Sequence, residues 1–325
     1  MTENNYRLIN MEDIVAEEVE WLWEGFIPVG KLTILQGDPG KGKTMAMLNL
    51  IAAFTTGRGM LEPPGGPAIR EPINVIYQTA EDGLADTIKP RLIAAGADCS
   101  RVSVIDDGDK MLSMTDERLA WAIRDTEAGL VVLDPLQAYL GEKVDMNRAN
   151  EVRPRLKHLG DIAYENRCGM VLVGHLNKKD TAKPEYKGLG SMDFTAAARS
   201  VLLCAESPRD KDVRVLASTK CSLTYPPDPV AFRLSKERGF EWEGIYDITT
   251  EELLQNTSVK GQKAKEAKEF LVAELPAPGE YIPSAELFEK AKQKNIAEKT
   301  LRNAMKELGV AAHKEADRWY TGYEA

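Results

Sequence analysis

The segment GDPGKGKT (residues 37–44) places three glycines, a lysine and a hydroxyl side chain within eight residues. It matches the phosphate-binding loop (P-loop) pattern G-x-x-x-x-G-K-[ST] at every position. Because glycine has no Cβ, the backbone N–H groups can curl around a chain of phosphates. Lys43 can then reach the β- and γ-phosphates, and the Thr44 hydroxyl can take one position on Mg²⁺. The segment predicts a site for ATP and Mg²⁺, with nucleotide contacts from Gly37, Asp38, Pro39, Gly40, Lys41, Gly42, Lys43, Thr44 and Met45.

Asp134 is the second residue with a predicted role at the metal. It ends the apolar run GLVVLD (129–134), and an aspartate at the end of a buried strand is a common second partner of Mg²⁺ in P-loop proteins. The alternative is that Asp134 only caps a turn with Pro135. Next to the P-loop pattern, we predict a metal site formed by Thr44 and Asp134.

Hydrolysis of ATP also needs a carboxylate that orients and deprotonates a water molecule. Asp134 is followed by Pro135 and not by a glutamate, so this base must come from another part of the chain. Glu81 lies just beyond the predicted strand NVIYQ (74–78) and is the predicted base. Asp82 is the alternative, although an N-cap of the following helix explains that residue better.

Three cationic or titratable residues follow later in the chain. His175 ends the apolar run GMVLVGH, where it could sense the γ-phosphate or be a hydrogen-bonded core histidine. Arg199 and Lys220 are the two cations that could stabilise charge on a phosphate bound by a neighbouring subunit. The sequence alone leaves the choice between these two open.

The segment 177–194 is long, basic and contains glycine. Long irregular loops in compact domains are usually functional or disordered. Its lysines could touch the phosphates of a nucleic-acid strand, or the loop could simply be solvated. These lysines are Lys178, Lys179, Lys183 and Lys187.

An alternation of strands and helices must position these residues. The strand KLTILQ (31–36) precedes the P-loop, and apolar residues at helical spacing follow it. Further strands are predicted over 73–78, 101–106, 129–135, 169–175, 199–205 and 214–219, and helices over 83–95, 148–166 and 116–127, the last of which ends at Gly129. Such alternation is typical of a doubly wound α/β sheet with mainly parallel strands, where ligands bind at the carboxyl ends of strands. Gln36, Glu81, Asp134 and His175 lie at or just beyond such ends.

The C-terminal part of the chain has a different pattern. Helices are predicted over about 263–275, 284–294 and 298–308, followed by a short hairpin. Three helices and a hairpin suggest a winged helix, whose third helix has an inner face of Leu301, Ala304, Met305 and Leu308 and an outer face of Lys299, Thr300, Arg302, Asn303 and Lys306. We predict an ATPase core over 1–250, a polar linker over 251–262 and a winged-helix-like domain over 263–325.

Charge limits the ways in which this chain could meet nucleic acid. The 325 residues carry a formal net charge of −9, to which residues 260–325 contribute +1 and the others −10. An acidic core does not attract DNA through its overall field. Any contact with DNA must therefore come from basic loops or from the C-terminal segment.

Nothing in the sequence predicts export or a membrane span. The N-terminus is acidic and lacks the basic and apolar parts of a signal peptide. No apolar run approaches the roughly 20 residues needed to cross a bilayer. The cysteines are widely spaced without a C-x-x-C motif, as expected for free thiols in a reducing cytoplasm. We expect a cytoplasmic protein without a zinc site.

Taken together, these motifs resemble those of the RecA-like ATPases. The resemblance covers roughly residues 20–245 and is carried by GDPGKGKT, Glu81, LVVLDP, VGHLNKK and GLGSMDFTAAARS. Within this group the motifs look most like those of the plasmid RepA-type hexameric replicative helicases and their phage or mobile-element relatives. The resemblance implies a RecA-type core that assembles into a hexameric ring, with ATP between subunits.

The resemblance also implies roles for individual residues. It makes Lys43 and Thr44 ligands of phosphate and Mg²⁺, Asp134 a metal partner, Glu81 the base, His175 a sensor and Arg199 the residue that reaches a neighbouring subunit. The loops after Asp134 and His175 would line a channel for single-stranded DNA, and other replication or recombination proteins would be partners. Two features depart from the pattern. Relatives of the DnaB type carry Lys-x-Arg on a late strand, whereas Ser222 stands two residues after Lys220 here, and a RepA-type core does not require a winged helix.

Two classes of function remain open at this point. One is a Mg²⁺-dependent ATPase that forms rings and moves on DNA, as a replicative helicase or a recombination-type motor. The other is a non-motor switch or scaffold, in which ATP sets the assembly state and the winged helix binds a DNA site or a partner protein. The acidic core and the nearly neutral C-terminal segment favour the second class somewhat. A kinase or switch ATPase on the same core is a third class.

Overall fold

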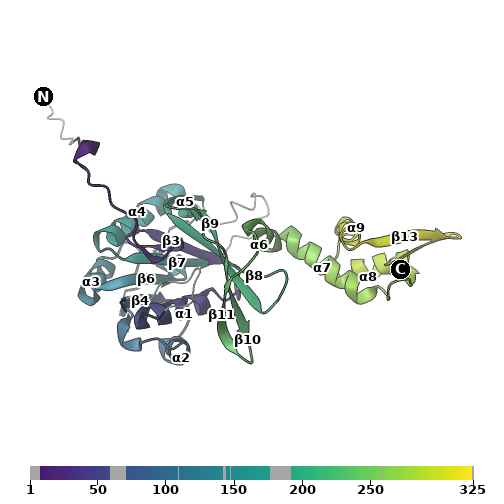
Figure 1. The fold of residues 1–325 in the computed structure, drawn as a ribbon, viewed down its shortest axis with the longest axis horizontal. Coiled ribbons are helices and arrows are strands. Elements are labelled where there is room, and N and C mark those ends of the chain that lie inside the picture. Colours follow the sequence, from purple (N-terminus) through teal and green to yellow (C-terminus); the bar gives the residue numbers. More distant parts are fainter. Residues whose placement is uncertain are drawn as a thin grey trace.

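The computed structural model describes residues 8–58, 71–108, 110–141, 144–146, 148–175, 192–257 and 259–323 (Figure 1). At its centre lies a nine-stranded sheet with helices on both faces. Across the sheet the strands are β11 (Gly239–Ile245), β10 (Val230–Ser235), β9 (Val213–Cys221), β8 (Ser200–Glu206), β3 (Leu32–Gly37), β7 (Gly169–His175), β6 (Ala128–Asp134), β4 (Asn74–Thr79) and β5 (Val102–Ser103). The predicted α/β class is confirmed.

The sheet is mainly parallel, with an antiparallel extension on one side. The strands from β8 to β5 pair in parallel, whereas β9, β10 and β11 add antiparallel pairs beyond β8. The chain passes from β3 to β4, and β6 and then β7 later fill the space between them. Because these strands are parallel, the carboxyl ends of β3, β7, β6 and β4 meet at one edge of the sheet, where ligands bind in this class of fold.

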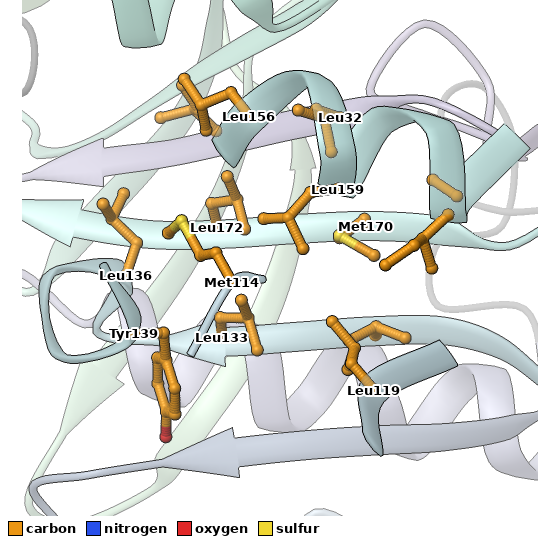
Figure 2. Close-up of a cluster of buried hydrophobic side chains, with 14 of the residues drawn as sticks. Leu32, Met114, Leu119, Leu133, Leu136, Tyr139, Leu156, Leu159, Met170 and Leu172 are labelled. Atoms are coloured by element: carbon orange, nitrogen blue, oxygen red, sulfur yellow. The ribbon is translucent and has the colours of Figure 1, made fainter. Parts of the chain in front are cut away.

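One face of the sheet is covered by α3 (Glu117–Thr126), α4 (Ala149–Glu165) and α5 (Met192–Ala197). Figure 2 shows this layer, in which Leu156 and Leu159 of α4 pack with Met170 and Leu172 of β7. Each of these four side chains is at most 1% exposed, and burial of one such side chain stabilises the fold by roughly 1.5–3 kcal/mol. The helical spacing of apolar residues in α4 thus fixes its orientation on the sheet.

The opposite face is covered by α1 (Lys43–Thr56) and α2 (Lys89–Ala94). Helix α1 is buried on almost all sides, as its nearly continuous apolar sequence predicts. An aromatic cluster lies on this side of the sheet: Trp23 stacks on Phe26 with ring centroids 4.0 Å apart, and Trp242 meets Trp23 edge-on. The two-stranded hairpin of β1 (Trp21–Trp23) and β2 (Ile27–Pro28) carries the first two of these rings. This packing fixes the start of β3 and, with it, the position of the P-loop.

Short helical turns lie before and between these elements. They are η1 (Met11–Asp13), η2 (Leu84–Ile88), η3 (Cys99–Arg101) and η4 (Leu136–Tyr139). η2 is a single turn of π-helix between β4 and α2, so the predicted helix over 83–95 begins in π geometry and continues as α2. Such turns are frequent at functional sites.

The predicted end of the helix over 116–127 is wrong. Helix α3 ends because Glu127 adopts a left-handed backbone with φ of 51°, and Gly129 lies inside β6. A Cβ built on Gly129 would lie 3.1 Å from Ile73. The glycine therefore serves the packing of Ile73 and not the end of the helix.

The predicted N-cap role of Asp82 is also wrong. Gly83 is the N-cap of η2, and no side chain caps this turn. Asp82 instead accepts a hydrogen bond from Arg91 Nη1 at 3.0 Å. The segment therefore begins with a turn of π-helix, and Asp82 forms an ion pair with Arg91 instead of capping it.

The C-terminal part folds around its own buried cluster. Helices α7 (Val259–Glu274), α8 (Ser284–Gln293) and α9 (Glu298–Glu307) pack against a three-stranded sheet. In their order across that sheet, the strands are β12 (Tyr281–Pro283), β14 (Arg318–Tyr323) and β13 (Val310–Glu315). Leu301, Ala304 and Met305 are buried in the cluster, as the sequence predicts.

The segment predicted as a linker, 251–262, is helical where the structure describes it. It is occupied by α6 (Thr250–Thr257) and the first turn of α7. Its many Glu, Gln and Lys residues are strong helix formers, which explains why a polar stretch is helical. Figure 1 shows α7 leading from α6, beside the sheet, to the C-terminal elements.

The described ranges contain no helix that is both long and apolar enough to cross a membrane. The four cysteines, Cys99, Cys168, Cys204 and Cys221, are free thiols. Cys204 is fully buried in β8, and burial raises its pKa to about 12. This thiol therefore stays protonated at neutral pH.

Candidate functional site

The P-loop connects β3 to α1 at the carboxyl edge of the sheet. Gly42 is the N-cap of α1 and has φ of 87°, a left-handed conformation that favours glycine. Gly37 lies against the backbone of β8, so that a Cβ built there would be 2.2 Å from the carbonyl oxygen of Cys204. No side chain caps the first turn of α1, which leaves its N–H groups available for an anion.

Replacing Gly37 with alanine is expected to destabilise the fold by about 3 kcal/mol, because the new methyl group collides with backbone that has little room to move. The free energy of unfolding in urea measures this change. Gly160→Ala is the matched control, since Gly160 lies inside α4 and a Cβ there comes no closer than 4.0 Å to Leu32. That variant is expected to be slightly more stable than the wild type. Equal stability of the two variants would contradict the close packing at Gly37.

The ammonium group of Lys43 is held inside the loop. Its Nζ donates to the carbonyl oxygens of Gly37 at 2.9 Å and Asp38 at 3.0 Å, and lies 3.2 Å from Nδ1 of His175. Burial lowers the pKa of Lys43, while the negative charges of Asp134, Asp38 and Glu81 oppose this shift. A cation at a helix N-terminus is also opposed by the helix dipole. The loop thus holds an unfavourably placed positive charge that a bound anion would stabilise.

Asp134 lies at the same edge, directly beside the end of β4. Its Oδ2 accepts hydrogen bonds from Thr44 Oγ1 at 2.9 Å and from the Tyr77 hydroxyl at 3.0 Å. Burial raises the pKa of Asp134, and the hydrogen bonds from Thr44 and Tyr77 oppose that rise. The structure therefore brings together the two residues that the sequence predicts as metal ligands.

Tyr77 belongs to this site although the sequence analysis did not identify it. The residue is fully buried on the α1 side of β4, together with Val75. Burial raises the pKa of its hydroxyl, which therefore remains a hydrogen-bond donor to Asp134. No signal in the strand marks this tyrosine, because four consecutive residues of β4 are buried and both faces of the strand are covered. A buried tyrosine hydroxyl needs a partner.

The oxygens of Thr44 and Asp134 suit a magnesium ion. In the described parts of the chain, no three His, Cys, Asp or Glu side chains gather so that they could hold a metal by themselves. Mg²⁺ does not need such a cage, because in nucleotide sites it is bound by one or two protein oxygens together with phosphates and water. The two side-chain oxygens, 2.9 Å apart, provide that protein share.

Glu81 lies two residues beyond the end of β4 and is exposed. The preceding residue, Ala80, donates its N–H to the carbonyl oxygen of Asp134 at 3.2 Å, which fixes the segment beside β6. Burial is the main influence on the pKa values of Lys43, Asp134 and His175, and the charge of Glu81 acts on all three in the upward direction. Glu81 therefore shares the site with these residues, whereas Asp82 pairs with an arginine of α2.

His175 ends β7 in register with Gly37. Burial lowers the pKa of its imidazole, and the positive charge of Lys43 lowers it further. The imidazole is therefore neutral at neutral pH, and it lies against the P-loop lysine at the sheet edge. The structure places it next to the group that would contact the γ-phosphate, as the sensor hypothesis requires.

The pKa of His175 is expected to lie below the ordinary value of about 6.5 in the nucleotide-free protein and to rise when a triphosphate is added. NMR titration of the imidazole protons measures both values. The chain has three histidines, and a His175→Asn variant assigns the signal. Because the folded state disfavours the charged ring, this group lowers stability as the pH falls through the unfolded value near 6.5. A His175 pKa above 7 without nucleotide would contradict the contact with Lys43.

Arg199 and Lys220 lie at the opposite edge of the sheet. The N–H of Arg199 donates to the carbonyl oxygen of Leu32, the first residue of β3, so about 16 Å of strand separates Arg199 from the P-loop. Lys220 donates to the carbonyl oxygens of Thr195, Ala196 and Ala198 and thereby caps the end of α5. The Arg199 side chain is exposed, beside a pocket of about 330 Å³ that Lys31, Arg153 and Lys157 also line.

The basic segment predicted as a loop over 177–194 lies outside the described residues up to position 191. Its lysines at 178, 179, 183 and 187 belong to that part. The last three residues of the segment form the beginning of α5. The interpretation of this segment therefore stays a prediction.

Two solved structures resemble the fold. A KaiC-like protein from the hyperthermophilic archaeon Pyrococcus horikoshii OT3 matches with a TM-score of 0.48 and 16% identity, over 68% of this chain and 93% of that one. The ATPase domain of G40P matches with a TM-score of 0.49 and 14% identity, over 66% of this chain and 85% of that one. No curated protein matches the sequence.

A family model described as an AAA domain matches residues 9–181, which is more than half of the chain. The matched range contains the P-loop, Glu81, Asp134 and His175, and ends before Arg199. The predicted identity as a RecA-like P-loop ATPase is confirmed by this match, and the mainly parallel sheet with the P-loop at its carboxyl edge agrees with it. The chain belongs to the AAA domain family of P-loop ATPases.

Proposed function

We propose that this chain is a Mg²⁺-dependent ATPase that assembles into a ring and acts as a DNA motor. The observation that supports hydrolysis most directly is the joint position of Lys43, Thr44, Asp134 and Glu81 at the carboxyl edge of the sheet. These are the groups that phosphoryl transfer to water requires: a phosphate-binding cation, oxygens for the metal, and a carboxylate near the attacking water.

Each of these residues has one role in the proposed reaction. Lys43 turns from the carbonyl oxygens of Gly37 and Asp38 to the phosphates of ATP. Thr44 and Asp134 would hold Mg²⁺, which would neutralise phosphate charge there. Glu81 accepts the proton of the attacking water, and its exposed position leaves room for that water. His175 contacts the γ-phosphate region through its place beside Lys43.

We propose a hexameric ring, as in the helicases that the sequence resembles. The position of Arg199 is the observation that supports this assembly. In one subunit this residue is separated from the P-loop by the length of β3, so it cannot reach its own ATP. Packing of identical subunits in a ring would bring the amino edge of one sheet toward the carboxyl edge of the next. Arg199 is proposed as the residue that reaches across, because the ammonium group of Lys220 already caps α5.

Action on single-stranded DNA is the most specific part of the proposal. We propose an ATPase core over 1–250 and a winged-helix-like domain over 263–325, joined through α6 and α7. The exposed face of α9 carries Lys299, Arg302, Asn303 and Lys306, although Arg302 also pairs with Glu298 at 2.7 Å. Replication or recombination proteins are the partners that such a motor would meet.

The alternative is a non-motor switch or scaffold, favoured by the distribution of charge. Residues 1–259 carry −10 and residues 260–325 only +1, which is a small electrostatic footprint for DNA. A titration with salt separates the two functions. Binding of DNA should weaken steeply as ionic strength rises, whereas a module that binds protein shows no such slope for DNA.

The test of the proposed function is steady-state ATP hydrolysis with and without single-stranded DNA, at low salt. Chelation of Mg²⁺ is expected to stop turnover. Stimulation by DNA of several-fold or more would support the motor. If DNA does not change turnover, the chain is still an ATPase, but the motor is contradicted. The switch or scaffold would then be the favoured function, with the C-terminal elements as the binding site for a partner.

A further inference from the structure

Glu206, the last residue of β8, links the P-loop to helix α7. Its Oε2 accepts a hydrogen bond from Lys41 Nζ at 2.8 Å, and its Oε1 accepts one from Lys265 Nζ at 3.2 Å. Arg214 of β9 lies at 4.0 Å from Oε2. Lys41 belongs to the P-loop and Lys265 to α7, so one carboxylate bridges two segments that are more than 200 residues apart in sequence.

The partly buried environment of Glu206 makes its ion pairs stronger than ion pairs on the exposed surface. Its side chain is only 17% exposed, against 31% for Lys41 and 30% for Lys265. Burial alone would raise the pKa of Glu206, but the hydrogen bonds from Lys41 and Lys265 outweigh it and hold the pKa below its ordinary value. The carboxylate is therefore charged at neutral pH and depends on its cationic partners.

The position of Glu206 follows from contacts of the P-loop with β8. The Cys204 carbonyl leaves room only for a glycine at position 37, and the Cys204 thiol donates to the carbonyl oxygen of Lys41 at 3.2 Å. Two residues further along β8, the same face presents Glu206 to the Lys41 side chain. The strand thus contacts the loop through backbone, thiol and carboxylate in turn.

Helix α7 connects the Glu206 ion pairs to the C-terminal elements. Lys265 faces Glu206, while Ala267, Phe270 and Leu271 in the next turns are buried in the cluster of the C-terminal elements. A second pair, Lys211 with Glu269 at 3.0 Å, is largely exposed and contributes little. Any change at Glu206 therefore acts on the helix that holds the C-terminal elements.

We propose that Glu206 is a positioning residue that couples occupancy of the P-loop to the docking of α7 on the core. The proposal rests on the nucleotide binding proposed above. A triphosphate attracts Lys41 toward the ligand and weakens its pair with Glu206. The carboxylate then interacts more strongly with Lys265 and Arg214, so that nucleotide binding holds α7 more firmly against β8.

Thermodynamic linkage makes this coupling reciprocal. If nucleotide strengthens the pair between Glu206 and Lys265, loss of Lys265 must weaken nucleotide binding. Lys265→Met is expected to raise the dissociation constant of a non-hydrolysable ATP analogue by about two- to five-fold, the range of partly exposed ion pairs. Turnover at saturating ATP should stay unchanged, because the residue does not touch the reacting atoms.

The matched control is Lys263→Met, which removes the same charge from the exposed surface of the same helix. Its affinity for the analogue is expected to equal that of the wild type. In a Glu206→Gln background, Lys265→Met should have less than half of its effect in the wild type. This double-mutant cycle separates the pair from the general loss of a positive charge.

Hydrogen exchange provides the second readout, without catalysis. Binding of the analogue is expected to slow exchange of the backbone amides of residues 263–274 in the wild type, and not in Glu206→Gln. Equal affinities of Lys265→Met and Lys263→Met for the analogue would overturn the coupling. So would amide exchange rates in α7 of the wild type that the analogue does not change. A wild-type protein that binds no analogue at all would instead overturn the proposed nucleotide site itself.

Discussion

Replacing Lys43 with alanine is expected to abolish tight binding of ATP. The ammonium group of Lys43 lies inside the P-loop, where it donates to the carbonyl oxygens of Gly37 and Asp38. Loss of a buried charge partner costs several kcal/mol, so the dissociation constant should rise about 100-fold or more. Calorimetric titration with a non-hydrolysable ATP analogue measures this change.

Lys110→Ala is the control for the Lys43 variant. Lys110 is also a lysine, but its side chain is 79% exposed and pairs with Asp116 away from the P-loop. Its affinity for the analogue should match that of the wild type. Retained micromolar affinity in Lys43→Ala would overturn the assignment of the P-loop. Thermal unfolding without nucleotide checks that the variant is folded, since burial already lowers the pKa of Lys43 and its charge does not stabilise the empty loop.

The parts of the fold that could be predicted are those that local pattern determines. The runs that became β6, β7 and β8 are continuous and apolar because both faces of these strands are buried. The helices α1, α3, α4 and α9 show apolar residues at helical spacing. From the carboxyl ends of such strands it was possible to predict that Asp134 and His175 would lie close to the P-loop, and the structure brings them to Lys43 and Thr44.

The outer strands of the sheet extension, β10 and β11, could not be predicted in the same way. Strands β10 and β11 form an edge hairpin whose outer strand alternates exposed and half-buried residues. Their sequence has many charged residues and no long apolar run. What fixes them is tertiary contact: Phe232 stacks on Phe240 with ring centroids 4.8 Å apart, and Trp242 meets both rings edge-on. Aromatic pairs of this kind are formed only after the strands meet.

The same distinction holds inside the site. Lys43, Thr44 and Asp134 belong to motifs whose spacing carries the chemistry, so they could be identified from sequence. Tyr77 and Glu206 belong to no motif, and their partners are 57 and 165 residues away along the chain. Contacts of that sequence separation leave no local pattern. Residues that support a motif therefore become visible only when the sheet brings the strands together.

Glu81→Gln is expected to bind ATP normally and to hydrolyse it at least about 100-fold more slowly, the scale of lost acid–base assistance. The substitution keeps the size of the side chain and removes only its ability to accept a proton. Because Glu81 is exposed, and no hydrogen bond of its side chain is described, the fold should be unaffected. Single-turnover hydrolysis and calorimetric titration, done on the same preparation, separate the chemical step from binding.

Asp82→Asn is the matched control, because it neutralises the adjacent carboxylate without altering the proposed base. Asp82 accepts a hydrogen bond from Arg91 and is thereby directed toward α2. Turnover of this variant should remain within a few-fold of the wild type. Normal turnover in Glu81→Gln would remove Glu81 from the mechanism, and a large loss in Asp82→Asn alone would make Asp82 the base. A loss in Glu81→Gln alone would identify the carboxylate at the end of β4 as the group that activates water, which is the role that its position beside Asp134 and Lys43 supports.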